Sequence, residues 1–237
     1  MAGEVNKGEF LLSILENLNR VRERVKAAAL RAGRNPSGIK VVAVTKNVTA
    51  PAIMEALACG VTDFGENRAQ EFLRKYEEMA VPGLNWHFVG YLQTNKVRKI
   101  IGKVEMVHSL DRWPLAEALS RAACEAECVC RALVQVNVAG ERTKHGLSVS
   151  ETEEFIAEAA RLPGLEIRGL MTIAPLDDDP ESARPVFRRL KELFDSFREK
   201  ALGLRMEFLS MGMSGDFEIA VEEGANILRI GKAIFGG

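Results

Sequence analysis

A lysine stands at the end of an apolar, β-branched run, where a charged side chain is unexpected. The stretch VVAVTKN (41–47) reads as a buried strand that stops directly before Lys46. A lysine held partly desolvated at a strand end has a lowered pKa and can present a neutral amine to a carbonyl carbon. The residues alone leave two interpretations open, a lysine that forms a Schiff base and a structural or anion-binding lysine.

Two segments near the end of the sequence have the features of a phosphate-binding site. The segment SMGMSGDFEIA runs through glycines into a predicted helix, with Ser214, Gly215 and Asp216 at the helix start. Free backbone N–H groups and a hydroxyl at a helix start suit a phosphate, whereas the Asp216 carboxylate argues against one. The segment RIGKAIFGG adds Arg229 and a tight turn at Gly231. The alternative is an ordinary N-cap followed by a C-terminal turn.

The elements that must position these residues alternate between strand and helix patterns. Eight strand-like runs separated by helix-length segments predict a single (β/α)₈ TIM barrel rather than an open doubly wound sheet, which would usually have a glycine-rich first turn. A helix over residues 5–33 precedes them, so we expect one domain over 1–237 with the N-terminal helix, within 1–35, packed on the barrel. The runs are IKVVAVT (39–45), VTDFG (61–65), WHFVG (86–90), EMVHSL (105–110), RALVQVNV (131–138), EIRGLM (166–171), MEFLS (206–210) and NILRIG (226–231).

The barrel prediction places Lys46 and the two candidate phosphate-binding segments at the same end of the barrel. In such barrels the chemistry collects where the strands end, and phosphate sites often follow strands seven and eight. Lys46 and the two glycine-containing segments would then face the same mouth. A molecule with an aldehyde at one end and a phosphate at the other satisfies both, such as pyridoxal 5′-phosphate or a phosphosugar aldehyde or ketone, the substrate of an aldolase.

Composition narrows the class of protein. The 237 residues carry a formal net charge of −1, which does not imply a nucleic-acid partner. The sequence has no apolar run of the roughly 20 residues that span a bilayer and no signal-peptide pattern, so we expect a cytoplasmic protein without membrane association. Cys124, Cys128 and Cys130 lack the paired spacing of a zinc site, and we expect no metal.

The sequence resembles the pyridoxal phosphate homeostasis protein family, whose fold is similar to the N-terminal barrel of alanine racemase. The resemblance covers nearly the whole chain from about Val42 to Gly236. It is carried by VAVTK (42–46), FGENRAQEF (64–72), WHFVGYLQTNK (86–96), VHSLDR (107–112), VQVNVAGERTKHG (134–146), RGLMTIAP (168–175), LSMGMSGDFEIAVEEGAN (209–226) and RIGKAIFG (229–236).

The resemblance implies a cofactor and the residues that hold it. It implies that Lys46 carries pyridoxal 5′-phosphate as an internal aldimine. It implies that the phosphate is held near Ser210, Ser214 and Gly215 and by the loop that ends at Gly231.

The resemblance also assigns three further positions around the cofactor. Asn67 in the GENR motif is expected to line the cofactor pocket. Arg229 is expected to face the pyridine nitrogen, or alternatively to pair with the phosphate. Lys232 stands where the family often has threonine, so a hydroxyl contact to the phosphate is not expected there.

The sequence favours a carrier of the cofactor over an enzyme. Racemases of this fold take a catalytic tyrosine from a second domain and work as dimers, whereas the tyrosines of this sequence are Tyr76, expected on a helix, and Tyr91, expected near the mouth. His87 and His108 are expected in the core, and His145, beside Lys144, in a loop that could close over the ligand. We expect a monomer that holds the cofactor and passes it to pyridoxal phosphate-dependent apoenzymes. The alternative is a weak amino-acid racemase or another pyridoxal enzyme.

Overall fold

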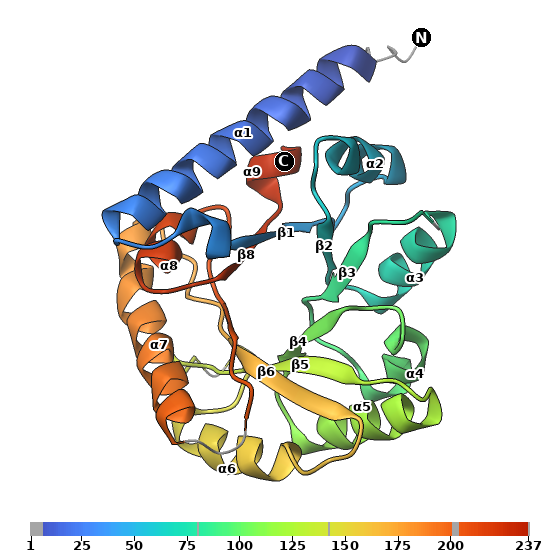
Figure 1. Cartoon of the computed structure of the whole chain (residues 1–237), viewed down its shortest axis with the longest axis vertical. Helices are drawn as coiled ribbons and strands as arrows, with labels where there is room; N and C mark the ends of the chain where they lie inside the picture. The colour runs from blue at the N-terminus through green and yellow to red at the C-terminus, as the bar shows by residue number, and fades with distance from the viewer. Residues whose placement is uncertain (1–6, 80, 142, 201–203, 237) are drawn as a thin grey trace.

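The computed structural model describes residues 7–79, 81–141, 143–200 and 204–236, and the strands within them close into a parallel barrel (Figure 1). The strands follow one another around the barrel in sequence order, and β8 pairs with β1 to close it. The predicted (β/α)₈ TIM barrel is therefore confirmed. The strands are β1 (Lys40–Val44), β2 (Asp63–Glu66), β3 (Asn85–Phe88), β4 (Met106–Leu110), β5 (Cys130–Gln135), β6 (Leu165–Met171), β7 (Phe208–Ser210) and β8 (Ile227–Ile230).

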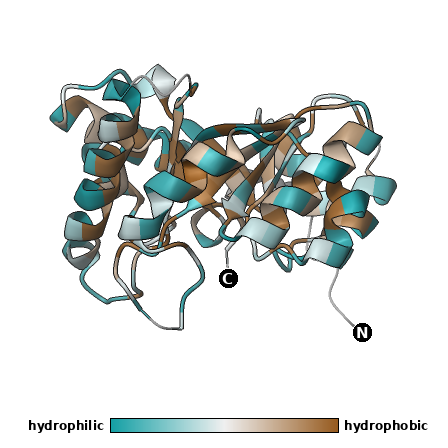
Figure 2. Ribbon diagram, turned by 90° about the horizontal axis from the view of Figure 1, so that it is seen from below, coloured by the Kyte–Doolittle hydropathy of each residue, from teal (hydrophilic) through white to brown (hydrophobic). Residues whose placement is uncertain are grey.

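Helices cover the outside of the barrel, and hydrophobic residues gather on the strands and on the helix faces turned toward them (Figure 2). The α-helices are α1 (Lys7–Arg31), α2 (Ala50–Ala58), α3 (Ala69–Glu78), α4 (Val97–Ile100), α5 (Trp113–Glu125), α6 (Val149–Ala159), α7 (Arg184–Glu199), α8 (Phe217–Glu222) and α9 (Lys232–Phe235). Short 3₁₀ turns are η1 (Pro36–Gly38), η2 (Thr94–Lys96) and η3 (Pro180–Ala183).

Two separate apolar clusters follow from the alternation of side chains along each strand. Outward-facing residues such as Phe64 and Trp86 pack under the helices in one large cluster. The inward-facing residues form a small second cluster inside the barrel, which consists of Val42, Met106, Leu133, Met171 and Ile227. Residues two positions further along a strand point to the same side of the sheet. The inward-facing positions that follow this small cluster therefore include polar side chains at the mouth of the barrel.

The strand pairing depends on one glycine where two backbones meet. A Cβ built on Gly169 of β6 would lie 1.8 Å from the carbonyl oxygen of Phe208 in β7. The register between β5 and β6 also shifts beside this glycine, between Ala132 and Leu133. A side chain at position 169 would therefore push β7 away and disturb the strand that leads to Ser210.

Helix α1 packs on the barrel at the seam where the chain closes. It contacts α2, α8 and α9, and it runs past α8 and α9 in Figure 1. Its buried face includes Leu18 and Val21, and Arg24 pairs with Glu218 of α8 at 2.7 Å. The expected helix over 5–33 corresponds to Lys7–Arg31, and its first two residues lie outside the described part of the chain.

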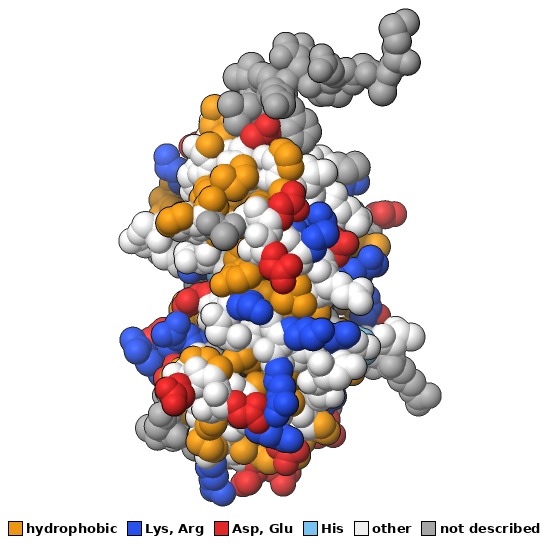
Figure 3. Space-filling view, turned by 90° about the vertical axis from the view of Figure 1, so that its right-hand side faces the viewer, with side chains coloured by type: hydrophobic (Ala, Val, Ile, Leu, Met, Phe, Trp, Pro, Cys, Tyr) orange, Lys and Arg blue, Asp and Glu red, His pale blue; other side chains and the backbone are white. Residues whose placement is uncertain are grey.

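Positive and negative side chains are mixed on the surface, in agreement with the nearly balanced charge of the sequence. The face in Figure 3 carries basic and acidic side chains interspersed. Among the described residues, no helix combines the length and apolar character that crossing a membrane requires. Within the same residues, no three His, Cys, Asp or Glu side chains are grouped as metal ligands would be.

Candidate functional site

A cavity of about 580 Å³ opens at the carboxyl ends of the strands and brings most of the predicted site residues together. Its walls come from the segments that follow β1, β2, β3, β6, β7 and β8. Six of the seven predicted residues line it, namely Lys46, Asn67, Ser214, Gly215, Arg229 and Gly231. The lysine and the two glycine-containing segments therefore share one cavity, as the barrel prediction required.

Lys46 lies at the mouth of this cavity, two residues beyond the end of β1. Thr45 takes the last buried position, whereas the Lys46 side chain is exposed. The Lys46 side chain is therefore open to water in this structure, and its partial desolvation stays a prediction. The next residue, Asn47, has a φ of 60°. A left-handed residue directly after Lys46 turns the chain toward α2.

A buried ion pair holds the residue before Lys46 and the neighbouring Asn67. Lys75 of α3 donates from Nζ to Glu66 Oε2 and to the carbonyl oxygen of Thr45, both at 2.7 Å. Glu66 also accepts hydrogen bonds from Thr45 Oγ1 at 2.9 Å and from the backbone N–H of Asn67 at 2.8 Å. The residue before Lys46 and the residue Asn67 are thus held by one fully buried carboxylate.

Asn67 lines the cavity and carries an unpaired acceptor. Its Oδ1 atom is buried and has no hydrogen-bond partner among the described residues. A buried acceptor without a partner costs free energy, so a ligand that donates a hydrogen bond there would gain by binding. This atom supports the expectation that Asn67 contacts a polar ligand.

The loop after β7 and the turn after β8 are joined in a cradle. Ser214 Oγ accepts a hydrogen bond from the backbone N–H of Ala233 at 3.1 Å, which ties the two segments together and leaves the hydroxyl proton free to donate. No atom lies within 4 Å of a Cβ built on Gly215, whereas a Cβ on Gly231 would lie 3.0 Å from the carbonyl oxygen of Val44. Helix α8 begins at Phe217 with Asp216 as N-cap, so Ser214 and Gly215 precede the helix rather than begin it.

Asp216 is the one acidic group built into this cradle. Its Oδ1 accepts from the backbone N–H of Met213, which fixes the loop that carries Ser214. Burial raises the pKa of the Asp216 carboxyl above its usual value, although that hydrogen bond and Arg229 oppose the shift. The carboxylate therefore has a structural partner of its own.

Arg229 is one of the buried residues that line the cavity and is 4% exposed. Its Nη1 donates to Ser210 Oγ at 2.6 Å and its Nη2 to the carbonyl oxygen of Thr172 at 2.8 Å. Burial lowers the pKa of the guanidinium to about 10, and the Asp216 charge opposes this. Ser210 is fully buried beneath Arg229 and does not line the cavity. Ser210 therefore has Arg229 as a partner in this structure, and a phosphate held near Ser210, as the resemblance implies, stays a prediction.

The sequence did not predict one wall of the cavity. The segment after β6, which reads as a polar loop, contributes Ile173, Leu176, Asp177 and Asp179, and Leu176 is 95% exposed. Lys232 was expected only to replace a threonine, yet it also lines the cavity. The signal for this wall was available, because every loop that follows a barrel strand lies at the same end.

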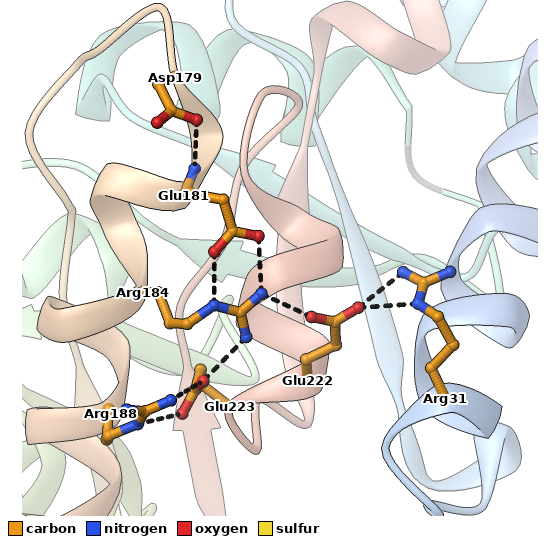
Figure 4. Close-up of polar contacts among 7 residues, drawn as sticks. All are labelled: Arg31, Asp179, Glu181, Arg184, Arg188, Glu222 and Glu223. Carbon is orange, nitrogen blue, oxygen red and sulfur yellow. Dashed lines mark hydrogen bonds and ion pairs between the residues drawn. The ribbon is translucent and has the colours of Figure 1, made fainter.

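An ion-pair network fastens this wall to the end of α8 and to α1 (Figure 4). Arg184, at the start of α7, contacts Glu181, Glu222 and Glu223 at 2.6 to 2.9 Å. Glu222 also pairs with Arg31 of α1 at 2.7 Å. The hydrogen bonds to its three glutamates raise the pKa of the Arg184 guanidinium above its usual value. The loop after β6, α8 and the N-terminal helix are therefore connected on the outside of the barrel.

Several residues considered for acid–base roles lie elsewhere. Tyr91 stacks on His145 at 4.2 Å between ring centroids, and Arg112 lies over the Tyr91 ring at 4.3 Å. Neither Tyr91 nor His145 lines the cavity in this structure, and closure of the His145 loop over a ligand stays a prediction. Tyr76 packs against Phe72, as expected for a packing residue. His87 and His108 are both buried inside the barrel, as predicted.

A family model described as the alanine racemase N-terminal domain matches residues 16–237 of the chain. The pyridoxal phosphate homeostasis protein of Aquifex aeolicus is 44% identical over 225 residues, which cover 95% of this chain and 98% of that protein. The chain belongs to the pyridoxal phosphate homeostasis protein family. A second member of this family, from Pseudomonas aeruginosa, is 41% identical over 94% of this chain and 95% of its own length.

Solved structures agree with this family assignment. PipY of Synechococcus elongatus with PLP bound is 36% identical, with a TM-score of 0.83 over 94% of this chain and all of that one. A D-threonine aldolase from Filomicrobium marinum is 18% identical, with a TM-score of 0.72 over 95% of this chain and 60% of its own length. The second likeness concerns the barrel fold alone.

Proposed function

We propose that this protein binds pyridoxal 5′-phosphate in the cavity at the carboxyl ends of the strands and holds it covalently through the Lys46 amine. The observation that carries the proposal is the placement of Lys46, Asn67 and the Ser214–Gly231 cradle around one cavity of about 580 Å³. The family membership and the PLP-bound structure of PipY support it.

The donor set fits this cofactor. The cradle offers the Ser214 hydroxyl and backbone N–H groups beside Gly215 and Gly231, where a dianionic phosphate finds donors and open space. Lys232, which follows β8 and lines the same cavity, adds a positive charge. Asn67 and the buried Arg229 line the same cavity, where Asn67 would offer an acceptor and Arg229 a cation to the bound cofactor. When bound, the cofactor supplies a reactive aldehyde that condenses with an amine.

The residues at the mouth favour storage and exchange over strong catalysis. Lys46 is exposed, so water and other amines can reach the linkage that it forms. Neither of the two tyrosines and none of the three histidines lines the cavity, which leaves it without the acid–base groups that the sequence raised as candidates. We infer a cytoplasmic carrier that acts as a monomer in homeostasis of the cofactor and delivers it to apoenzymes.

Borohydride reduction followed by peptide mapping tests this function. The purified protein is incubated with pyridoxal 5′-phosphate, reduced, digested and analysed by mass spectrometry. We expect the phosphopyridoxyl mass on the peptide that contains Lys46 and its loss in Lys46→Ala. Lys99→Ala, at an exposed lysine of α4, is the matched control and should retain the adduct on Lys46. An adduct mainly on another lysine would contradict the proposal.

A second measurement separates the carrier from an enzyme. The protein loaded with the cofactor is incubated with single L-amino acids, and the D-isomer is quantified by chiral chromatography. We expect no turnover beyond that of free pyridoxal 5′-phosphate. Steady formation of a D-amino acid that is lost in Lys46→Ala would instead support a racemase.

A further inference from the structure

A chain of hydrogen-bonded polar side chains crosses the interior of the barrel from the cavity to its opposite end. Ser210 Oγ lies 3.0 Å from His108 Nδ1, and His108 Nε2 lies 3.0 Å from His87 Nδ1. His87 Nε2 lies 3.0 Å from Asp63 Oδ1. With the bond from Arg229 to Ser210 at 2.6 Å, five side chains on five strands are joined end to end.

These side chains are inside the barrel and shielded from water. His108 lies two residues after Met106, and Arg229 lies two residues after Ile227, so both share the inward face with the interior apolar cluster. The exposed fractions run from 0% for His108 and Ser210 to 7% for Asp63. At the far end, Asp63 pairs with Lys40 at 2.7 Å, and both line a cavity of about 640 Å³ between α1 and the amino ends of the strands.

With Asp63 ionised and both histidines neutral, every bond in the chain has one direction. An ionised Asp63 only accepts, so His87 must carry its proton on Nε2 and accept on Nδ1. His108 then donates from Nε2 and accepts on Nδ1, where the Ser210 hydroxyl donates. The Ser210 oxygen in turn accepts from the Arg229 guanidinium, which only donates.

Both histidines must be neutral for this arrangement. A protonated His87 would add a positive charge inside the barrel to that of Arg229 and near the partly exposed Lys40, with Asp63 as its single anionic partner in the chain. Burial together with the nearby His87, Arg229 and Lys40 lowers the pKa of His108 well below its usual value. Hydrogen bonds aligned in one direction polarise one another, and the low dielectric of the interior strengthens them.

We propose that His87, His108 and Ser210 are positioning residues that hold Arg229 in place for the bound cofactor, through a one-way hydrogen-bond chain anchored by Asp63 at the opposite end of the barrel. This inference rests on the proposed function, because Arg229 is given its role by the cofactor. It assigns a purpose to two histidines that contact neither the cavity nor the solvent.

The tautomers can be read without any cofactor. The sequence contains three histidines, so ¹⁵N-detected ring correlations of the ligand-free protein give three resolvable systems. We expect His87 and His108 to be neutral and protonated on Nε2 at pH 7, with His145 in its loop as the third system. A proton on Nδ1 of either buried histidine, or a doubly protonated His87, would overturn the proposal even if pyridoxal 5′-phosphate never binds.

A pair of variants at Asp63 tests whether the chain acts on the site. Asp63→Leu leaves the His87 N–H without an acceptor. Asp63→Asn keeps one, because Lys40 donates to the same oxygen and holds the amide oxygen in that place. We expect Asp63→Leu to weaken binding of pyridoxal 5′-phosphate by about tenfold and to shift the visible absorbance band of the bound cofactor. Asp63→Asn should restore both.

The matched control removes a buried hydroxyl that lies outside the chain. Ser120 of α5 donates to the carbonyl oxygen of Pro163 at 2.6 Å, so Ser120→Ala loses one hydrogen bond without touching the barrel interior. It should leave the band and the affinity unchanged. An unchanged band and affinity in folded Asp63→Leu would overturn the proposal, while the Lys46 adduct would still stand. If Asp63→Leu does not fold, Ser210→Ala and the tautomer measurement decide.

Discussion

Lys75 Nζ and Glu66 Oε2 lie 2.7 Å apart, and both side chains are completely buried. The pair stands directly behind the proposed cofactor lysine, because Lys75 also holds the carbonyl of Thr45 and Glu66 also holds the N–H of Asn67. It therefore connects the ends of β1 and β2 to α3. We regard it as the part of the fold that positions the backbone at Lys46 and Asn67.

Removal of the cation from this pair should destabilise the protein strongly. Lys75→Met leaves the Glu66 carboxylate buried without its charged partner, and we expect the free energy of unfolding to fall by about 3–5 kcal/mol. Urea denaturation followed by circular dichroism measures this. Lys99→Met, at an exposed lysine, is the control and should change it by less than about 0.5 kcal/mol. A loss below about 1 kcal/mol in Lys75→Met would mean that the carboxylate finds another partner or a proton.

A methyl group at Gly90 should disturb the same side of the cavity. A Cβ built there lies 2.1 Å from the carbonyl oxygen of Asn67, and Gly90 itself lines the cavity. Gly90→Ala must move the Asn67 backbone, so we expect a loss of about 1–3 kcal/mol in stability and weaker binding of pyridoxal 5′-phosphate. Gly38→Ala is the control, because no atom lies within 4 Å of its Cβ. Equal affinity in both variants would argue against a role for Asn67.

The sequence predicted the parts of the molecule that follow from the local pattern of apolar and polar residues. Alternating strand and helix patterns were sufficient for the barrel, and the position of Lys46 directly after the first run placed it at the mouth. The glycines around Ser214 and Gly231 marked the two segments of the cradle in the same way. These features need only the chain direction and the rule that strand ends gather at one face.

The parts that remained hidden depend on contacts between distant residues. Ser210 follows a strand as a phosphate ligand would, and only the approach of Arg229 from the next strand shows that its hydroxyl is engaged. His87 and His108 were correctly expected in the core, yet their mutual hydrogen bond follows from the stagger of β3 and β4. The role of Lys75 was invisible for the same reason, since a lysine in the middle of a charged helix normally faces water.

The network around Arg184 should contribute more stability than its surface position suggests. Arg184 has three glutamate partners and a side chain that is 25% exposed, whereas Arg188 is 61% exposed and pairs with Glu223 alone. We expect Arg184→Met to cost about 1–2 kcal/mol in urea denaturation and Arg188→Met to cost less, because the exposed Arg188 is screened by solvent. The difference should shrink in 1 M salt, because the Debye length at that concentration is about 3 Å and the charges are screened beyond it. Equal costs at low salt would show that the additional pairs of Arg184 contribute nothing.

The charge on Asp63 should make stability depend on pH in acid. Burial raises the pKa of this carboxyl, but hydrogen bonds from His87, Lys40 and Thr62 outweigh it and hold the pKa well below its usual value. A group whose pKa is lower in the folded state binds protons more readily in the unfolded state. Its contribution is therefore complete above the unfolded pKa of about 3.9 and is lost as the pH falls toward the folded value.

Asp63→Asn removes this titration and keeps the hydrogen-bond acceptor for His87. We expect wild type to be the more stable protein at pH 7 and its advantage over the variant to shrink progressively between about pH 5 and pH 2. Urea denaturation at each pH measures the difference, and lowered pKa values elsewhere, such as at Glu222, act equally in both proteins and cancel. Parallel stability curves over this range would mean that Asp63 has the same pKa in the folded and unfolded chain, and its hydrogen bonds to His87 and Lys40 would then carry no charge-dependent stabilisation.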